Sequence, residues 1–400
     1  MKLGDDFWKN EEKLTTSENI DLEAPFTEEE IKAAVFDSHS DGAPGPDGLP
    51  FLFYQNFWEV IKKDLMALFS SFDKEEINLA RLNYATVVLI LKEPNAINLK
   101  KFRSISLLNC SFKIFSKALN NRLIKVCDRL IAPNQTDFIE GRFILESVGA
   151  AHEIIHEVSR NKENVIILKL DYEKACDRVS WEFLEEMLTT RGFGTKWIYW
   201  IRCVVRDGSL CVRLNDEDSH HFKPGKGLRQ GDPLSPLLFN LVANVFTRML
   251  MKAADHNLIV GLMKNSIDGG IISLQYADDT ILFLNNDLDK VWHLKLLRCP
   301  ATIVGLEGIL KDKKKLVKVV KKILGLKDTF VTVLSELAMA LLFGFLMDIH
   351  NAHKKNLSCA GGFTVKDMVV INGCEFGITK KPREFGIHSK GHDFFFTFLA

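Results

Sequence analysis

Two short apolar runs separated by three residues constrain the fold of this 400-residue chain most strongly. Residues 271–276 and 280–284 have the composition of strands, and only Ala277, Asp278 and Asp279 lie between them. So short a link makes the strands pair antiparallel, so the segment predicts a β-hairpin. A further buried strand is predicted at 165–170 (VIILKL), which runs directly into Asp171.

The segments before and between these strands have apolar residues at helical spacing. Thr27 and Glu30 have the pattern of a capping box at the first helix, whereas the Gly- and Pro-rich residues 41–50 predict a loop. Residues 1–24 are polar, and we expect them to be loosely ordered. The helices are expected at 26–36, 51–72, 111–127, 149–160, 181–188, 196–205 and 233–251, with further strands at 85–91 and 209–214. Helices beside an antiparallel hairpin, rather than a parallel sheet, predict an α+β fold.

The net charge is zero, with 52 basic and 52 acidic side chains, whereas nucleic-acid-binding proteins usually carry a basic excess. The charges are unevenly distributed, however. The first 30 residues hold ten acids and three lysines, and residues 311–327 hold eight lysines and one aspartate. A neutral total is therefore compatible with a basic channel.

Eight cysteines form no CxxC pair, and the first ten residues contain no apolar run of the kind a signal peptide has. We therefore expect an intracellular protein, nuclear or cytoplasmic, that is not secreted. Residues 330–347 are mostly apolar but include Glu336, and 18 residues is short for a membrane span. We favour a buried helix there and expect no membrane partner.

Asp171, Asp278 and Asp279 are expected together at strand ends. Neighbouring carboxylates repel one another unless a cation neutralises them, and Mg²⁺ prefers such hard oxygen ligands. Two such ions about 4 Å apart can activate a hydroxyl and stabilise a leaving oxygen. The alternative is an ordinary turn, because Asp is common in hairpin tips.

Six motifs follow one another along the chain: 41–50 (DGAPGPDGLP), 101–123 (KFRSISLLNCSFKIFSKALNNRL), 135–142 (QTDFIEGR), 168–181 (LKLDYEKACDRVSW), 225–240 (GKGLRQGDPLSPLLFN) and 276–279 (YADD). Together and in this order they resemble the motifs of non-LTR (LINE-class) retrotransposon reverse transcriptases, particularly those common in plants. The resemblance covers residues 26–286.

The resemblance implies a right-hand polymerase that makes DNA from deoxynucleotide triphosphates on an RNA template with a DNA primer. It implies two Mg²⁺ ions, which Mn²⁺ can replace, and no protein partner. We expect a polar segment at 1–25, a fingers-like region at 26–165, a palm at 166–300 and a degenerate thumb or unassigned tail at 301–400.

The matching motifs also imply roles for single residues. Asp171 and Asp278 would hold the metal ions, and Asp279 would assist them. Seven further residues would contact the nucleotide or its template: Lys92, Arg103, Tyr172, Cys176, Arg229, Gln230 and Gly231. Taken alone, Lys92 would be read as a solvated lysine.

The chain departs from the family pattern in two places. Five residues after Asp171 the family carries Tyr or Phe, whose ring excludes a 2′-hydroxyl, but this chain has Cys176. After the hairpin, only an echo of the next family motif remains around Gly305 and Leu306. We therefore expect a truncated copy with low activity.

Two other functions compete with this interpretation. His152, Glu153 and His156 form an HExxH pattern, which would bind zinc in a peptidase if a third ligand followed. The lysines of residues 311–327 would suit a nucleic-acid-binding relic without catalysis, although a solvated helix face is the simpler interpretation.

The small side chain of Cys176 predicts weak discrimination against ribonucleotides, because a thiol leaves room for a 2′-hydroxyl. Single-nucleotide incorporation, measured with deoxynucleotides and ribonucleotides in separate reactions, tests this expectation. A strong preference for deoxynucleotides would contradict it.

Overall fold

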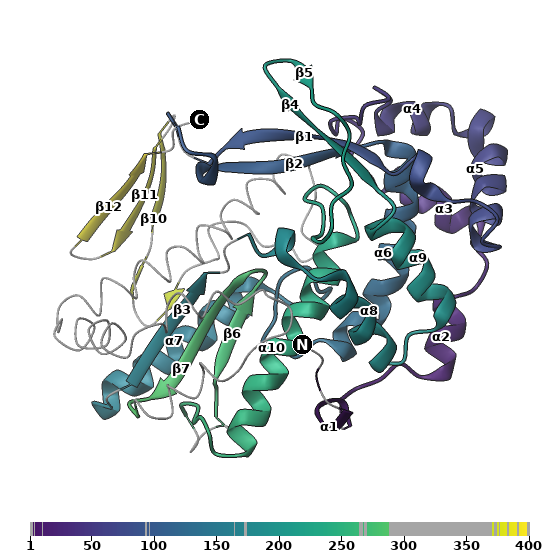
Figure 1. Cartoon of the computed structure of the whole chain (residues 1–400). Coiled ribbons are helices and arrows are strands. Elements are labelled where there is room, and N and C mark those ends of the chain that lie inside the picture. The colour runs from purple at the N-terminus through teal and green to yellow at the C-terminus, as the bar shows by residue number, and fades with distance from the viewer. Residues whose placement is uncertain are drawn as a thin grey trace. The chain divides into compact units, whose positions relative to one another are not determined.

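The computed structural model describes residues 3, 5–9, 11–92, 94–95, 97–163, 165–171, 174–263, 267 and 270–287, and the backbone of five strands between residues 370 and 397. The chain divides into two compact units, Met1–Leu341 and Leu342–Ala400. Figure 1 shows the mixture of helices and strands in the first unit. This mixture confirms the predicted α+β class.

The described helices of the first unit are α1 (Asp5–Trp8), α2 (Thr16–Leu22), α3 (Glu28–Phe36), α4 (Phe51–Asn56), α5 (Trp58–Asp73), α6 (Cys110–Leu130), α7 (Ile144–Asn161), α8 (Trp181–Thr190), α9 (Thr195–Val205) and α10 (Ser235–Asp255), with short 3-10 helices η1 (Leu79–Arg81), η2 (Leu99–Lys101) and η3 (Cys176–Arg178). Its described strands are β1 (Tyr84–Leu91), β2 (Phe102–Leu108), β3 (Val165–Asp171), β4 (Ser209–Leu214), β5 (Glu217–Asp218), β6 (Ser273–Tyr276) and β7 (Asp279–Asn285).

The predicted helix starts and the loop are largely confirmed. The Thr27 hydroxyl accepts the Glu30 N–H at 3.3 Å, and the Glu30 carboxylate accepts the Thr27 N–H at 3.1 Å, which completes the capping box. The helix predicted over 51–72 is instead two helices, because Phe57 lies outside helical geometry at φ −103° and ψ 18°.

The expectation of a loosely ordered N-terminal segment is wrong. It forms α1 and α2, and Thr15 caps α2 in a second capping box with Glu18. Three apolar residues of this polar segment, Trp8, Leu14 and Leu22, are buried, whereas Ile20 is exposed. Burial of three apolar side chains is enough to dock a segment whose remaining residues are solvated.

The predicted hairpin is confirmed within a three-stranded antiparallel sheet of order β3-β7-β6. One face packs on α10 through Ile166, Leu168, Leu282, Phe246 and Leu250. The other face packs on α7 through Val165, Phe283, Ile154 and Val158. Figure 1 shows these two helices beside the sheet.

A second sheet has the order β2-β1-β4-β5. Its strands β1 and β2 pair antiparallel, but β1 and β4 pair parallel, so the expectation of antiparallel pairing alone is incomplete. Sequence analysis also missed β2. Its sequence, FRSISLL, includes a charged residue and two serines that weaken the strand signal.

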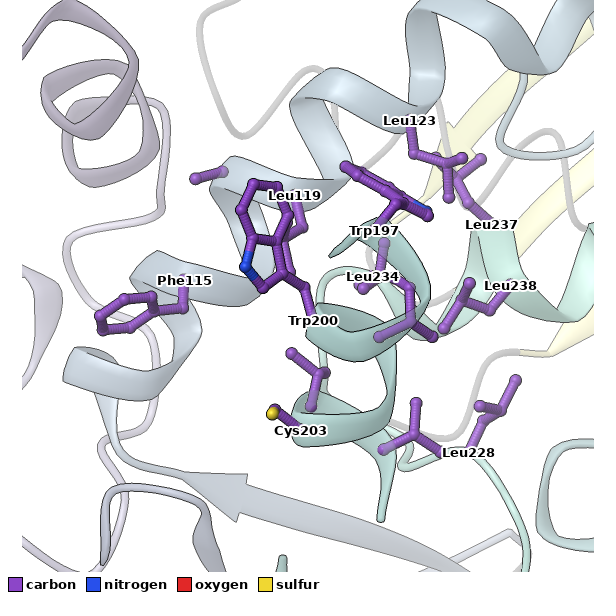
Figure 2. Close-up of a cluster of buried hydrophobic side chains, with 14 of the residues drawn as sticks. Phe115, Leu119, Leu123, Trp197, Trp200, Cys203, Leu228, Leu234, Leu237 and Leu238 are labelled. Carbon is purple, nitrogen blue, oxygen red and sulfur yellow. The ribbon is translucent and has the colours of Figure 1, made fainter. Parts of the chain in front are cut away.

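The main core lies where α6, α9 and α10 meet (Figure 2). Trp197 and Trp200 are fully buried, and Phe115 stacks on Phe69 with ring centroids 3.9 Å apart. Figure 2 shows Leu234, Leu237 and Leu238 close to these rings. Burial of side chains this large contributes several kcal/mol, at about 25 cal/mol per Å² of apolar surface.

In the second unit the structure describes only the backbone of β8 (Val370–Ile371), β9 (Cys374–Glu375), β10 (Gly377–Lys381), β11 (Glu384–Ser389) and β12 (His392–Thr397). The last three pair antiparallel. Residues 288–369, which include most of the expected thumb or tail region and the apolar residues 330–347, lie outside the described residues. Within the described residues α10 is long and apolar enough to cross a membrane, but 72% of its most apolar window is buried.

Arg122 ties the N-terminal helices to α6. Its guanidinium bonds both carboxylate oxygens of Glu30, at 2.9 and 2.7 Å, and the carbonyl oxygens of Leu22 and Ala24, at 2.9 and 2.6 Å. The group is 3% exposed and lies over the Phe26 ring, 4.0 Å from the centroid. Burial raises the pKa of Glu30, but the bonds from Arg122 and Thr27 outweigh it and leave this pKa lowered.

We expect Arg122→Met to lower the free energy of unfolding by about 3 kcal/mol, because it leaves carbonyl groups and a carboxylate without their buried donor. Arg129→Met is the matched control. Its ion pairs with Glu12 and Glu18 are more exposed, so it should cost less than about 1 kcal/mol. Urea denaturation of both variants measures the difference, and equal losses would contradict the assignment.

Candidate active site

The tip of the β6–β7 hairpin is a two-residue turn. Tyr276 pairs with Asp279, so Ala277 and Asp278 form the turn, and Asp279 already belongs to β7. Ala277 has φ 49°, in the left-handed region that residues with a Cβ seldom adopt. Asp278 is exposed and Asp279 is partly exposed.

The neighbouring strand β3 brings a third acidic position to this turn. In the antiparallel register Asp171 lies directly opposite Asp279. Opposite positions place their Cβ atoms about 4.5–5.5 Å apart. The side chain of Asp171 is not described, and among the described side chains no three Asp, Glu, His or Cys gather as a metal site. The juxtaposition of the predicted aspartates therefore follows from strand register.

A lysine that sequence analysis did not single out lies beside the aspartates. The Nζ atom of Lys169 is 2.9 Å from Oδ1 of Asp279, and both side chains are about two-fifths exposed, at 41% and 43%. An ion pair this exposed contributes little to stability. Its effect is local, because it places a positive charge on one of the site carboxylates.

Cys176 begins η3, close to the hairpin. Burial and, second, the charge of Asp278 raise the pKa of its thiol to about 12, so the thiol is neutral at neutral pH. Its carbonyl oxygen accepts the N–H of Leu228 at 2.8 Å. Tyr172, also predicted for the site, lies outside the described residues.

The loop of the GKGLRQGDPLSP motif contacts both the segment that follows Asp171 and strand β2. Gly227 (φ 96°) and Gly231 (φ 110°) both have left-handed backbones. A Cβ at Gly227 would lie 2.8 Å from the carbonyl oxygen of Asp177, and one at Gly231 would lie 2.7 Å from that of Ser106. Glycine is therefore required at both positions. The carbonyl oxygen of Gln230 accepts the Ser106 N–H at 2.8 Å, which joins this loop to β2.

Two nitrogens of the Arg229 guanidinium donate hydrogen bonds within the protein. The guanidinium donates to the side-chain oxygen of Asn83 and to the carbonyl oxygen of Val204, the latter at 2.6 Å. It also lies over the Phe112 ring, 4.9 Å from the centroid. Burial lowers the pKa of Arg229. The guanidinium thus fastens the loop to Asn83, which precedes β1, and to α9, and its expected contact with a nucleotide stays a prediction.

Lys92 and Arg103 lie on the β1–β2 hairpin of the second sheet. Both are exposed, and Arg103 is paired with Ile90 across the strands. Burial raises the pKa of Asp177, while the charges of Lys174 and Lys92 oppose the increase. Lys92 is therefore within electrostatic reach of the segment that follows Asp171.

The zinc-peptidase alternative gains no support. His152, Glu153 and His156 are exposed on α7, and among the described side chains they have no third ligand near them. The lysines of residues 311–327 lie outside the described residues.

The QTDFIEGR motif contributes to the site a glutamine for which the sequence predicted no role. Gln135 is 1% exposed, and its amide bonds the main chain of Ala277 in the turn. Its partner Asn240 on α10 is fully buried. The presence of Gln135 in a family motif was the only available signal, because a sequence does not show which polar residues are buried together.

Comparisons with known proteins agree with these features. The sequence profile of the family described as "Reverse transcriptase (RNA-dependent DNA polymerase)" matches residues 90–327. The "Transposon TX1 uncharacterized 149 kDa protein" of Xenopus laevis is 31% identical over 269 residues, which cover 67% of this chain and 20% of that protein. The "Retrovirus-related Pol polyprotein from type-1 retrotransposable element R2" of Nasonia vitripennis is 27% identical over 258 residues, which cover 64% and 24%.

This chain therefore spans about a fifth to a quarter of the length of these two relatives. A solved structure of apo telomerase from Candida tropicalis, truncated from the C-terminal domain, has a TM-score of 0.40 and 13% identity. That alignment covers 64% of this chain and 62% of the telomerase chain. Because the family profile matches more than half of the 400 residues and includes both Asp171 and the YADD turn, the chain belongs to the reverse transcriptase (RNA-dependent DNA polymerase) family, among those of non-LTR retrotransposons.

Proposed function

We propose that this chain is the polymerase core of a retrotransposon and that it synthesises DNA on an RNA template. The observation that carries the proposal is the register of β3 and β7, which sets Asp171 opposite Asp279 with Asp278 in the adjoining turn. Family membership supplies the reaction, and this arrangement supplies the acidic positions that the reaction requires.

Reverse transcriptases in general use divalent metal ions, and the described residues suit such ions. The Asp278 carboxylate is exposed in the hairpin turn, so an ion that keeps part of its water shell can reach it. We infer that Asp171 and Asp278 hold two Mg²⁺ ions, that Asp279 assists, and that Mn²⁺ can replace Mg²⁺. Bound ions would activate the primer hydroxyl and stabilise the leaving oxygen.

The other predicted site residues fall into three groups, which in our proposal contact the triphosphate, the sugar and the template. Lys92 and Arg103 are exposed cations on the β1–β2 hairpin, and in our proposal they neutralise the triphosphate of the incoming nucleotide. We infer that Tyr172 and Cys176 would contact its sugar. Gln230 contacts the template, and Arg229 acts mainly by holding that loop in place.

The substrates in this proposal are deoxynucleotide triphosphates, an RNA template and a DNA primer. We also propose an intracellular location, nuclear or cytoplasmic, and an element of the plant type. A non-catalytic nucleic-acid-binding relic is the second candidate, and the observation that favours it is the group of eight lysines in residues 311–327.

Mg²⁺ should raise the melting temperature of the protein, because a ligand that binds only the folded state stabilises it. The stabilisation is about 2.7 kcal/mol when free Mg²⁺ is about 100-fold above its Kd. Asp278→Ala should melt higher than the wild type without Mg²⁺, because one repelling charge is removed, and should respond little to the ion.

Asp64→Ala is the matched control, because it removes an exposed carboxylate from α5. Its response to Mg²⁺ should equal that of the wild type. Differential scanning calorimetry measures all three proteins, and a wild-type melting temperature that millimolar Mg²⁺ leaves unchanged would refute the metal site.

Primer extension on an RNA template tests the activity itself. The wild type and Asp64→Ala should extend a DNA primer with deoxynucleotides and Mg²⁺, whereas Asp278→Ala should lose at least about 100-fold in rate, because a metal ligand is gone. Template binding without extension by a folded wild type would favour the non-catalytic relic instead.

A further inference from the structure

The side-chain amide of Gln135 forms two hydrogen bonds with the turn that carries Asp278. Its Oε1 accepts the Ala277 N–H at 3.1 Å, and its Nε2 donates to the Ala277 carbonyl oxygen at 3.2 Å. We propose that Gln135 is a positioning residue that fixes this turn and thereby the metal-binding carboxylates. The inference rests on the proposed polymerase function for its catalytic consequence, but not for the structural role.

The turn needs such a support. A residue with a Cβ held at positive φ is strained and persists only where its surroundings enforce this conformation. Ala277 is at φ 49°, and one side-chain amide satisfies both its main-chain groups. Because Gln135 is only 1% exposed, water competes poorly for these two bonds.

The orientation of the Gln135 amide is itself determined. The carbonyl oxygen of Asp137 can only accept, so the Nδ2 group of Asn240 must point to it, at 2.7 Å. The Oδ1 atom of Asn240 then faces Nε2 of Gln135, at 3.2 Å. The Asp137 N–H donates to Oε1 of Gln135 at 3.1 Å. These bonds leave one arrangement in which the amide matches the donor and acceptor of Ala277.

The main chain around Gln135 is held as firmly as its side chain. Gln275 of β6 donates its N–H to the Asn134 carbonyl oxygen at 2.8 Å and accepts the Thr136 N–H at 3.2 Å. The guanidinium of Arg142 donates to the carbonyl oxygens of Gln135 and three neighbouring residues, and the bond to Gln135 is 2.8 Å long. The segment thus adds to the edge of β6 and presents Gln135 to the turn.

Without the two hydrogen bonds from Gln135, the turn should move and displace its carboxylates relative to the opposite strand β3. A displacement of about 1 Å in a catalytic group can cost about 100-fold in rate. Substrate binding depends on other residues of the proposed site, so kcat should fall while KM for the deoxynucleotide changes little.

The test compares Gln135→Met, which keeps the side-chain length and removes the amide, with Asn244→Leu. Asn244 lies one turn further along α10 and is 3% exposed. It accepts the Ala132 N–H at 2.9 Å and donates to the Leu130 carbonyl oxygen at 3.1 Å, so its loss removes a buried amide away from the hairpin. Asn240→Leu is a second variant, which removes the hydrogen bond that orients the Gln135 amide and leaves Gln135 itself in place.

Hydrogen–deuterium exchange of peptides covering residues 273–281 gives a readout independent of activity. Gln135→Met and, to a smaller extent, Asn240→Leu should exchange faster in this segment, whereas Asn244→Leu should match the wild type there. In primer extension with Mg²⁺, Gln135→Met should lose about 100-fold in kcat with KM within about twofold of the wild type.

Unchanged exchange in the hairpin of a folded Gln135→Met, or of Asn240→Leu if Gln135→Met does not fold, would overturn the proposal. Equal losses of kcat in Asn244→Leu and Gln135→Met would also overturn it, because a general loss of packing would then explain both. If the wild type extends no primer but the hairpin of Gln135→Met exchanges faster, the structural role stands and the proposed polymerase activity fails.

Discussion

The backbone ladder between β3 and β7 is the interaction on which the candidate active site depends. It runs from Val165 opposite Asn285 to Asp171 opposite Asp279. A slip of one residue would turn every side chain of a strand to the other face of the sheet. Such a slip is prevented because both faces are buried, one on α10 and the other on α7. The apolar packing of the sheet therefore also determines where the carboxylates lie.

The acidic positions are tolerated because they lie where the packing of this sheet ends. Asp278 is exposed and Asp279 is partly exposed, so water solvates charges that a core would exclude. Lys169 neutralises one of them from the neighbouring strand. Behind the turn, the environment is the opposite, because Gln135 and Asn240 are buried and bonded to each other. The solvated, charged hairpin turn is thus supported by the buried, hydrogen-bonded amides of Gln135 and Asn240.

The loop of the GKGLRQGDPLSP motif connects the two sheets by close backbone contact rather than by long side chains. Gly227 meets the segment after Asp171, and Gly231 meets β2. At the end of this loop Asp232 is 4% exposed and accepts bonds from the hydroxyls of Ser116 on α6 and Ser235 on α10. One carboxylate therefore joins the start of α10 to α6.

The sequence by itself determined the α+β class, the YADD hairpin, Asp171 at a strand end and the family, because these follow from local periodicity and motif order. It did not reveal the helices before Glu23, where few apolar residues are spread among charges, or the strand β2 with its polar residues. Only the tertiary structure decided that Arg229 is engaged by Asn83 and Val204 and that Gln135 holds Ala277. Those contacts join residues between 25 and 146 positions apart, and hydrogen bonds at such separations depend on how elements pack, which local sequence patterns do not encode.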